Sequence, residues 1–186
     1  MKKLKLLYHS DAPIAKTGFG KNAKFLLTYL HKTGKYEIIN YACGVPWSSP
    51  ELDKLPWKSF GSLPDDPREL EQLNRDPNLA RMAAYGSYNI DRIMLQEKPD
   101  VYIGVQDFWA FDGYMFGKYY WNKIPCVIHS TLDSLPLLKS SIDNAPKIKD
   151  FFVWSNFAEK EMHRLGHKHV KTLHTAIDTN YFYRLP

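Results

Sequence analysis

Residues 4–43 decide the fold class, and they read LKLLYHSDAPIAKTGFGKNAKFLLTYLHKTGKYEIINYAC. The apolar run at 4–8 is followed directly by polar residues, a pattern typical of a buried parallel strand. Between 19 and 32, apolar side chains recur at helical spacing and lysines occupy the other face, so we expect a helix that stops at Gly34. The apolar run at 36–43 predicts a second strand, which makes this stretch a βαβ unit.

The same alternation continues along most of the chain. Strands that alternate with helices are typical of a doubly wound α/β domain with a mainly parallel, Rossmann-like sheet and helices on both faces. The 186 residues fit one such domain, so we expect 1–186 to form a single domain. Further strands are expected at 100–105, 125–130, 151–155 and 170–176, and further helices within 68–97, near 111–121 and up to Leu165.

Residues 44–67 interrupt the alternation. This stretch reads GVPWSSPELDKLPWKSFGSLPDDP and holds five prolines and two tryptophans. We predict a long surface loop, an excursion within the domain. Trp47 and Trp57 need burial, which argues against a disordered linker.

The composition limits the classes of partner. The net charge of +5 favours contact with anions such as phosphate, a nucleotide or a membrane surface, although a solvated basic face gives the same total. No basic block or aromatic-basic repeat predicts a nucleic-acid partner. Lys21, Lys24 and Lys32 could present a basic face of the first helix, so peripheral membrane contact stays open.

The cysteines and the hydropathy indicate a cytoplasmic protein. Cys43 and Cys126 both lie in apolar runs, as reduced core cysteines do. The basic start MKKLKLLYHSD carries only a short, broken apolar run, so we do not expect a signal peptide. No stretch approaches the ~20 apolar residues that a membrane-spanning helix needs.

The loop SDAPIAKTGFGKN, residues 10–22, leads into the first helix and raises the question of a phosphate site. A Walker A loop would need glycine at Ala15 and a hydroxyl at Asn22, so we exclude a P-loop. The segment GFGKNA matches G-x-G-x-x-A, but it starts well after the strand, and the second strand ends without an acid. What remains is either a glycine loop that offers a helix N-terminus to an anion or sugar hydroxyl, or a simple turn.

Side chains just after each strand are candidates for binding, because ligands of such sheets lie outside the carboxyl ends of the strands. Asp107 lies among aromatic residues in VQDFWAFDGY. An acid beside rings such as Trp109 suits a sugar acceptor, whose hydroxyls bond the acid while its C–H faces stack on the ring. The alternative is a helix N-cap beside core aromatics. Asp133 could accept a proton from an acceptor, or cap the next turn.

Five segments follow one another along the chain: SDAPIAKTGFGKNAKFLLTYL, KPDVYIGV, IPCVIHSTLDSLP, VWSNFAEKEMHRLG and LHTAIDTNYFYRLP. In this order they resemble the amino-terminal half of family 4 glycosyltransferases, which have the two-domain B-type fold. The last is the most specific, because the family has a turn resembling H-G-V-D-x-x-x-F-x-P. Thr175 to Asp178 and Phe182 follow that turn, with Ala176 replacing the usual glycine, and Pro186 comes four residues after Phe182. The resemblance covers roughly 1–45 and 98–186.

The resemblance implies a retaining transferase that moves a sugar from a nucleotide-sugar co-substrate to a sugar, lipid or protein acceptor, with no other cofactor. It implies that this chain is the acceptor-binding half, inactive alone, and that a donor-binding domain would follow Pro186. By motif match it assigns His129 to the transferring sugar, where the ring can donate to a sugar hydroxyl or the leaving group. We expect Asp107, Trp109 and Asp133 on the acceptor side. The loop expected to face the donor phosphates and sugar is Thr17, Gly18, Phe19, Gly20 and Lys21.

Other interpretations stay open. The chain could be a stand-alone, non-catalytic module of this fold that binds a sugar or another ligand, or, less favoured, a dinucleotide-dependent oxidoreductase. His129 could be purely structural, and Asp178 could simply shape the final turn. We expect no metal site, because Gly166 ends a helix between His163 and His167 and so separates their faces.

Overall fold

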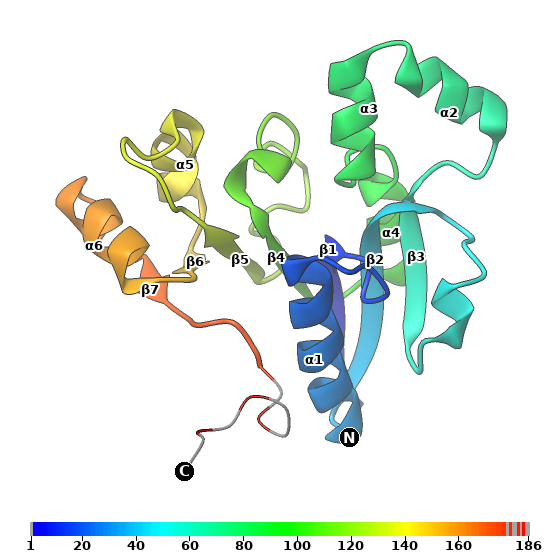
Figure 1. Ribbon diagram of the computed structural model, residues 1–186, viewed down its shortest axis with the longest axis horizontal. Coiled ribbons are helices and arrows are strands. Elements are labelled where there is room, and N and C mark those ends of the chain that lie inside the picture. The colour runs from blue at the N-terminus through cyan, green and yellow to red at the C-terminus, as the bar shows by residue number, and fades with distance from the viewer. Residues whose placement is uncertain (1, 178, 180–181, 183, 185–186) are drawn as a thin grey trace.

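The computed structural model describes residues 2–177, 179, 182 and 184. Its centre is a seven-stranded sheet in which every strand pair is parallel, in the order β3-β2-β1-β4-β5-β6-β7 (Figure 1). The predicted doubly wound α/β class is confirmed. The strands are β1 (Leu4–Asp11), β2 (Tyr36–Pro46), β3 (Lys58–Leu63), β4 (Val101–Asp107), β5 (Cys126–Thr131), β6 (Asp150–Val153) and β7 (Lys171–Thr172).

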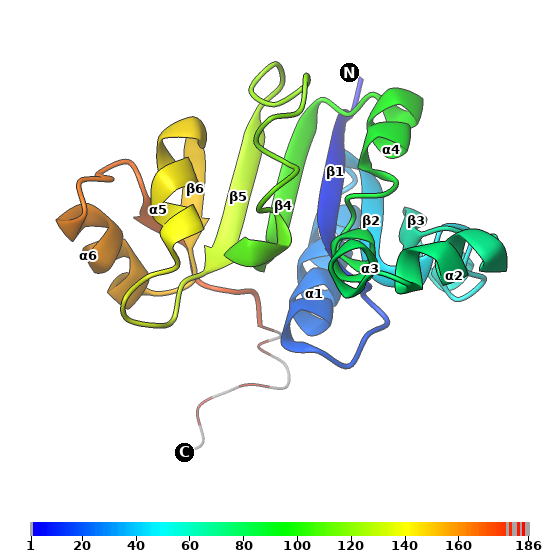
Figure 2. The same cartoon turned by 90° about the horizontal axis from the view of Figure 1, so that it is seen from above.

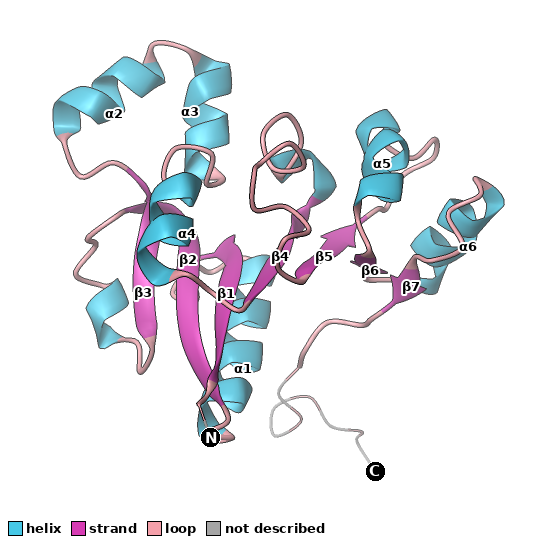
Figure 3. Ribbon diagram, turned by 180° about the vertical axis from the view of Figure 1, so that it is seen from behind, coloured by secondary structure: helices cyan, strands magenta, loops and turns pink. Residues whose placement is uncertain are grey.

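Helices cover both faces of the sheet. Helix α1 lies in front of the sheet in Figure 1, and α4 lies in front of it when the molecule is seen from behind in Figure 3. Figure 2 shows the two helices on opposite sides of β1. The helices are α1 (Gly18–Lys32), α2 (Pro67–Asn74), α3 (Pro77–Ala84), α4 (Ile90–Glu97), α5 (Lys139–Asn144) and α6 (Asn156–Arg164), with short 3-10 turns η1 (Leu52–Lys54), η2 (Phe108–Ala110) and η3 (Ala145–Lys147).

Two apolar layers hold the sheet between its helices. Alternate residues of each strand point to opposite faces, so Tyr8 packs with Leu27 of α1, while Leu7 packs in the layer of α4. The larger layer, behind the sheet, also takes Ala158 and Met162 of α6. The chain thus places α1 on one face and its later helices α4 and α6 on the other.

The connection from β3 to β4 creates a switch point in the sheet. From β1 the chain moves outward to β2 and β3, then returns to place β4 on the other side of β1. At such a switch point the loops after neighbouring strands diverge and leave a crevice at their carboxyl ends. Here the switch point lies between β1, which ends at Asp11, and β4, which ends at Asp107.

The excursion at 44–67 differs from the prediction. It contains an edge strand, β3, which pairs with β2 from Ile39 opposite Lys58 to Ala42 opposite Gly61. Gly61 explains why the strand can form, because a Cβ there would lie 1.9 Å from the carbonyl oxygen of Pro46. Trp47 and Trp57 are buried, as their need for burial predicted.

Two other predicted elements differ. The helix expected near 111–121 is wrong: after η2 the chain forms turns, with Gly113 at φ +82° and Asn122 at φ +62°. Positive φ values break the regular α-helical backbone. The last strand is also shorter than predicted, since β7 covers only Lys171–Thr172.

Candidate functional site

Asp11 lies at the switch point and is held by two neighbours. The hydroxyl of Thr17 donates to its Oδ2 at 2.5 Å, and the Nε2 amide of Gln106, at the end of β4, donates to its Oδ1. The carboxylate therefore joins the end of β1 to β4 and to the start of α1. Asp11 also lines a hollow of about 360 Å³ with Gly44 and Tyr85.

The two glycines of the loop before α1 have different surroundings. A Cβ on Gly20 would lie 2.6 Å from the carbonyl oxygen of Ala15 and 2.8 Å from that of Ala12, so this glycine lets the loop fold back onto the helix. A Cβ on Gly18 would meet nothing within 4 Å. Gly18 is thus the glycine with open space for a ligand, whereas Gly20 is needed for packing.

Thr17 is the N-cap of α1. Its Oγ1 accepts the backbone N–H of Gly20 at 2.9 Å while donating to Asp11. The N–H groups of Gly18 and Phe19 donate no hydrogen bond within the described part of the chain. They are free helix-terminal donors, although the negative charge of Asp11 stands beside them.

The predicted acceptor residues lie together at the next strand ends. Asp107 and Thr131 are opposite each other in the β4–β5 register, and the Thr131 hydroxyl donates to the Asp107 carboxylate. Asp107, Trp109 and Asp133 line one hollow of about 290 Å³, with Leu137 among its apolar walls. Asp107 precedes η2, but its side chain caps no helix N–H.

Tyr85 lies beside both the hollow of Asp11 and the Trp109 ring, and it is a residue that sequence reasoning missed. It lines the hollow of Asp11, and its ring contacts that of Trp109 edge-on, with 4.7 Å between the two ring centres. Burial and the negative charge of Asp11 raise the pKa of the Tyr85 phenol, which therefore stays protonated and able to donate at neutral pH. Thr131 is also a site residue that our prediction did not include.

Three side chains that are distant in the sequence hold the backbone at Tyr85 and Gly86 through hydrogen bonds. His9 Nε2 donates to the carbonyl oxygen of Tyr85 at 3.0 Å, and the Tyr114 hydroxyl donates to the same oxygen at 2.8 Å. The Tyr41 hydroxyl donates to the carbonyl of Gly86 at 2.7 Å. These bonds hold the turn between α3 and α4 against β1 and β2. Tyr85 therefore lies near the carboxyl ends of the strands.

His9 has a defined protonation state. Its Nε2 donates to Tyr85, so its Nδ1 accepts, and the Tyr102 hydroxyl donates to it at 2.8 Å. Burial lowers the pKa of His9 to about 3, so the ring is neutral at neutral pH. His9 is therefore a structural residue, which holds the backbone at Tyr85 in place.

His129 lies beneath the chain that follows β7. Its side chain is buried, and Nε2 donates to the carbonyl oxygen of Leu173 at 2.6 Å. Burial lowers its pKa, so the neutral ring leaves Nδ1 as an acceptor. The centre of its ring lies 5.7 Å from the ring centre of Trp154. The Trp154 ring centre lies 4.8 Å from that of Phe19 in the glycine loop.

The chain after β7 reaches back to α1. The backbone N–H of Ala176 donates to Oδ1 of Asn22 at 2.8 Å. Asp178 and Pro186, which belong to the motif at the end of the sequence, lie outside the described residues. Lys21 is exposed on α1.

Neither a membrane span nor a metal cluster is found in the described part of the chain. None of its helices combines the length and the apolar character needed to cross a bilayer. No three His, Cys, Asp or Glu side chains among the described residues gather as metal ligands would. Cys43 and Cys126 are free and buried.

Comparison with known proteins gives no identity. No known protein family matches the sequence, and no curated protein matches it significantly.

Proposed function

We propose that this chain is the acceptor-binding, Rossmann-like domain of a retaining glycosyltransferase that uses a nucleotide-sugar donor. One observation carries the proposal: Asp107, Trp109 and Asp133 line a single hollow at the carboxyl edge of a doubly wound sheet. That edge, beside the switch point, is where ligands of such sheets bind. The motif resemblance of the sequence to family 4 glycosyltransferases supports the same conclusion.

The hollow suits a sugar hydroxyl acceptor. Carboxylates accept hydrogen bonds strongly, and Thr131 already orients the carboxylate of Asp107. Trp109, 36% exposed, offers an aromatic surface to the C–H groups of a sugar ring. Asp133 is exposed and can accept the proton of an acceptor hydroxyl. The acceptor can be a free sugar or a sugar on a lipid or protein.

The loop Thr17–Lys21 is the proposed donor-facing element. Gly18 has open space above it, and the free N–H groups of Gly18 and Phe19 can bind a phosphate oxygen or a sugar hydroxyl. On the side of Asp11 a hydroxyl is favoured, because the carboxylate repels phosphate. Donor base and ribose contacts are assigned to a separate donor-binding domain or subunit.

His129 has a narrower proposed role than the sequence suggested. Its Nε2 already donates to Leu173, so Nδ1 is the atom left to accept a hydrogen bond from a hydroxyl of the transferring sugar. Donation from Nε2 to the leaving group would require the Leu173 carbonyl to move away. The neutral state of the ring suits either role.

Calorimetric titration with simple methyl glycosides tests the proposal. Any glycoside that binds the wild-type protein should bind the Asp107→Asn variant about tenfold more weakly, because the substitution replaces a charged hydrogen-bond acceptor by a neutral amide. Asp150→Asn is the matched control, since Asp150 begins β6 at the opposite edge of the sheet. Equal losses in both variants, or glycoside binding unaffected by Asp107→Asn, would contradict the assignment.

A further inference from the structure

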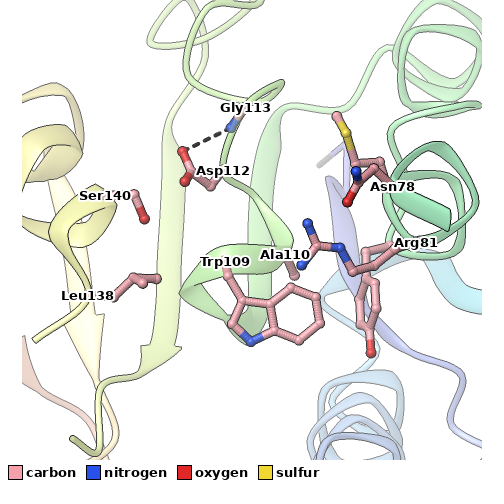
Figure 4. Close-up of a pocket in the computed structure, with 10 residues that line it drawn as sticks. Asn78, Arg81, Trp109, Ala110, Asp112, Gly113, Leu138 and Ser140 are labelled. Atoms are coloured by element: carbon pink, nitrogen blue, oxygen red, sulfur yellow. Dashed lines mark hydrogen bonds between the residues drawn. The ribbon is translucent and has the colours of Figure 1, made fainter. Parts of the chain in front are cut away.

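A second hollow adjoins the proposed acceptor site. It has a volume of about 430 Å³, within the range of small-molecule sites, and lies between α3, the segment after β4 and α5 (Figure 4). It shares Trp109 and Leu138 with the hollow of Asp107. The two hollows therefore form one surface on which a ligand can extend past Trp109.

Arg81 of α3 faces this surface with unused donors. Its guanidinium carbon lies 5.5 Å from the centre of the Trp109 ring. Among the described residues it makes neither a salt bridge nor a side-chain hydrogen bond. Figure 4 shows the guanidinium pointing from α3 toward Trp109. All five N–H donors remain available to a ligand.

The opposite wall supplies acceptors rather than a partner for Arg81. Asp112 accepts the backbone N–H of Gly113 at 2.9 Å through Oδ1, which leaves Oδ2 available. Figure 4 shows Asp112 and Ser140 across the hollow from Arg81 and Asn78. A ligand lying over Trp109 would contact the Arg81 cation at one end. At its other end it would find oxygen atoms that can accept hydrogen bonds from its hydroxyl groups.

We infer that this hollow binds a pyranose ring that carries one carboxylate, as a uronic acid does. The planar fork of Arg81 matches a carboxylate in a bidentate arrangement, and the Trp109 ring stacks on the sugar. Asp112 and Ser140, on the wall opposite Arg81, bind the hydroxyls at the far end. A dianionic phosphate fits less well, because Asp112 shares the hollow. This inference rests on the proposed function, since the uronate would be the acceptor sugar or the unit next to it.

Titration with matched sugars tests the inference. Methyl β-D-glucuronide should bind about fivefold more tightly than methyl β-D-glucoside at low ionic strength, and salt should reduce the difference. Glucose 6-phosphate should bind no more tightly than the glucuronide. Equal affinity for glucuronide and glucoside, or tighter binding of the phosphosugar, would overturn the carboxylate assignment.

Substitutions of Arg81 test whether this side chain causes the preference for the glucuronide. Arg81→Gln should abolish the preference for the glucuronide over the glucoside, whereas Arg81→Lys should retain part of that preference. Arg75→Gln is the matched control, because Arg75 is an exposed arginine that pairs with Glu71. A preference that survives Arg81→Gln would overturn the inference.

The outcomes distinguish this inference from the proposed function. Binding of neutral glycosides that depends on Asp107, without a carboxylate preference, would retain the proposed function and reject the inference. Absence of binding by every sugar, charged or neutral, would reject both. Circular dichroism of the Arg81 variants should be unchanged, because the side chain is exposed.

Discussion

Thr17 donates a hydrogen bond to the carboxylate of Asp11 at 2.5 Å, and this contact ties the start of α1 to the end of β1. The same hydroxyl oxygen accepts the N–H of Gly20. The loop is thereby closed by one side chain, with Gly18 left open at its surface. The arrangement explains how a glycine-rich loop can be held in place while Gly18 keeps open space beside it.

Thr17→Ala should lower the free energy of unfolding by about 1 kcal/mol, because it removes the N-cap hydrogen bond. Thr17→Ser keeps the hydroxyl and should be close to wild type. Urea denaturation of the two variants measures the difference. An alanine variant as stable as the serine variant would show that the cap contributes nothing.

Gly20→Ala should destabilise the fold by about 1–3 kcal/mol, because the added Cβ would press on the carbonyls of Ala15 and Ala12. Gly18→Ala is the matched control, since its Cβ meets nothing within 4 Å. Alanine favours the helix, so Gly18→Ala should be neutral or stabilising. Thermal unfolding of both proteins checks the prediction, and equal melting temperatures would contradict it.

His9→Phe should lower the free energy of unfolding by about 2 kcal/mol, because it removes the hydrogen bonds that His9 makes with Tyr85 and Tyr102. The turn at Tyr85 should also loosen. Amide hydrogen exchange at residues 85–87 should therefore accelerate more than exchange in α1. Uniform acceleration throughout the molecule would count against a specific anchoring role.

The stability of the protein should fall as the pH is lowered from about 6.5 toward about 3. The pKa of His9 is about 3 in the fold and 6.5 ordinarily, so in this window the unfolded chain binds the proton first. His9→Gln should flatten this part of the profile, whereas His31→Gln, at an exposed histidine, should not. Denaturant titrations at several pH values give the slopes, and identical slopes for wild type and His9→Gln would contradict the prediction.

The fold class could be read from the sequence where local periodicity is strong. The run 4–8 and the amphipathic stretch 19–32 each carry their own signal, and β1 and α1 form there. Strand β3 could not be read, because its pairing depends on Gly61 approaching the backbone at Pro46. The aromatic spacing at 111–121 resembles a helix, but glycine and asparagine at positive φ turn the chain instead.

The site was partly predictable for the same reason. Asp107 follows a strand, so topology alone carries it to the carboxyl edge. Tyr85 is held near that edge by hydrogen bonds from His9, Tyr114 and Tyr41 to the turn between α3 and α4. Such long-range contacts leave no periodic pattern in the sequence.

The central claim is that this domain binds the acceptor sugar and not the nucleotide donor by itself. Its most direct test follows the ¹⁵N resonances of the backbone and the Trp109 indole while glycosides, nucleotide sugars and NAD are added in separate titrations. We expect glycosides to shift Trp109, Asp107 and Thr131. Nucleotide sugars should bind no more tightly than about 1 mM, because a single exposed helix-terminus contact contributes only about 1 kcal/mol. Micromolar binding of NAD or of a nucleotide sugar, or glycoside shifts confined to another surface, would contradict the account.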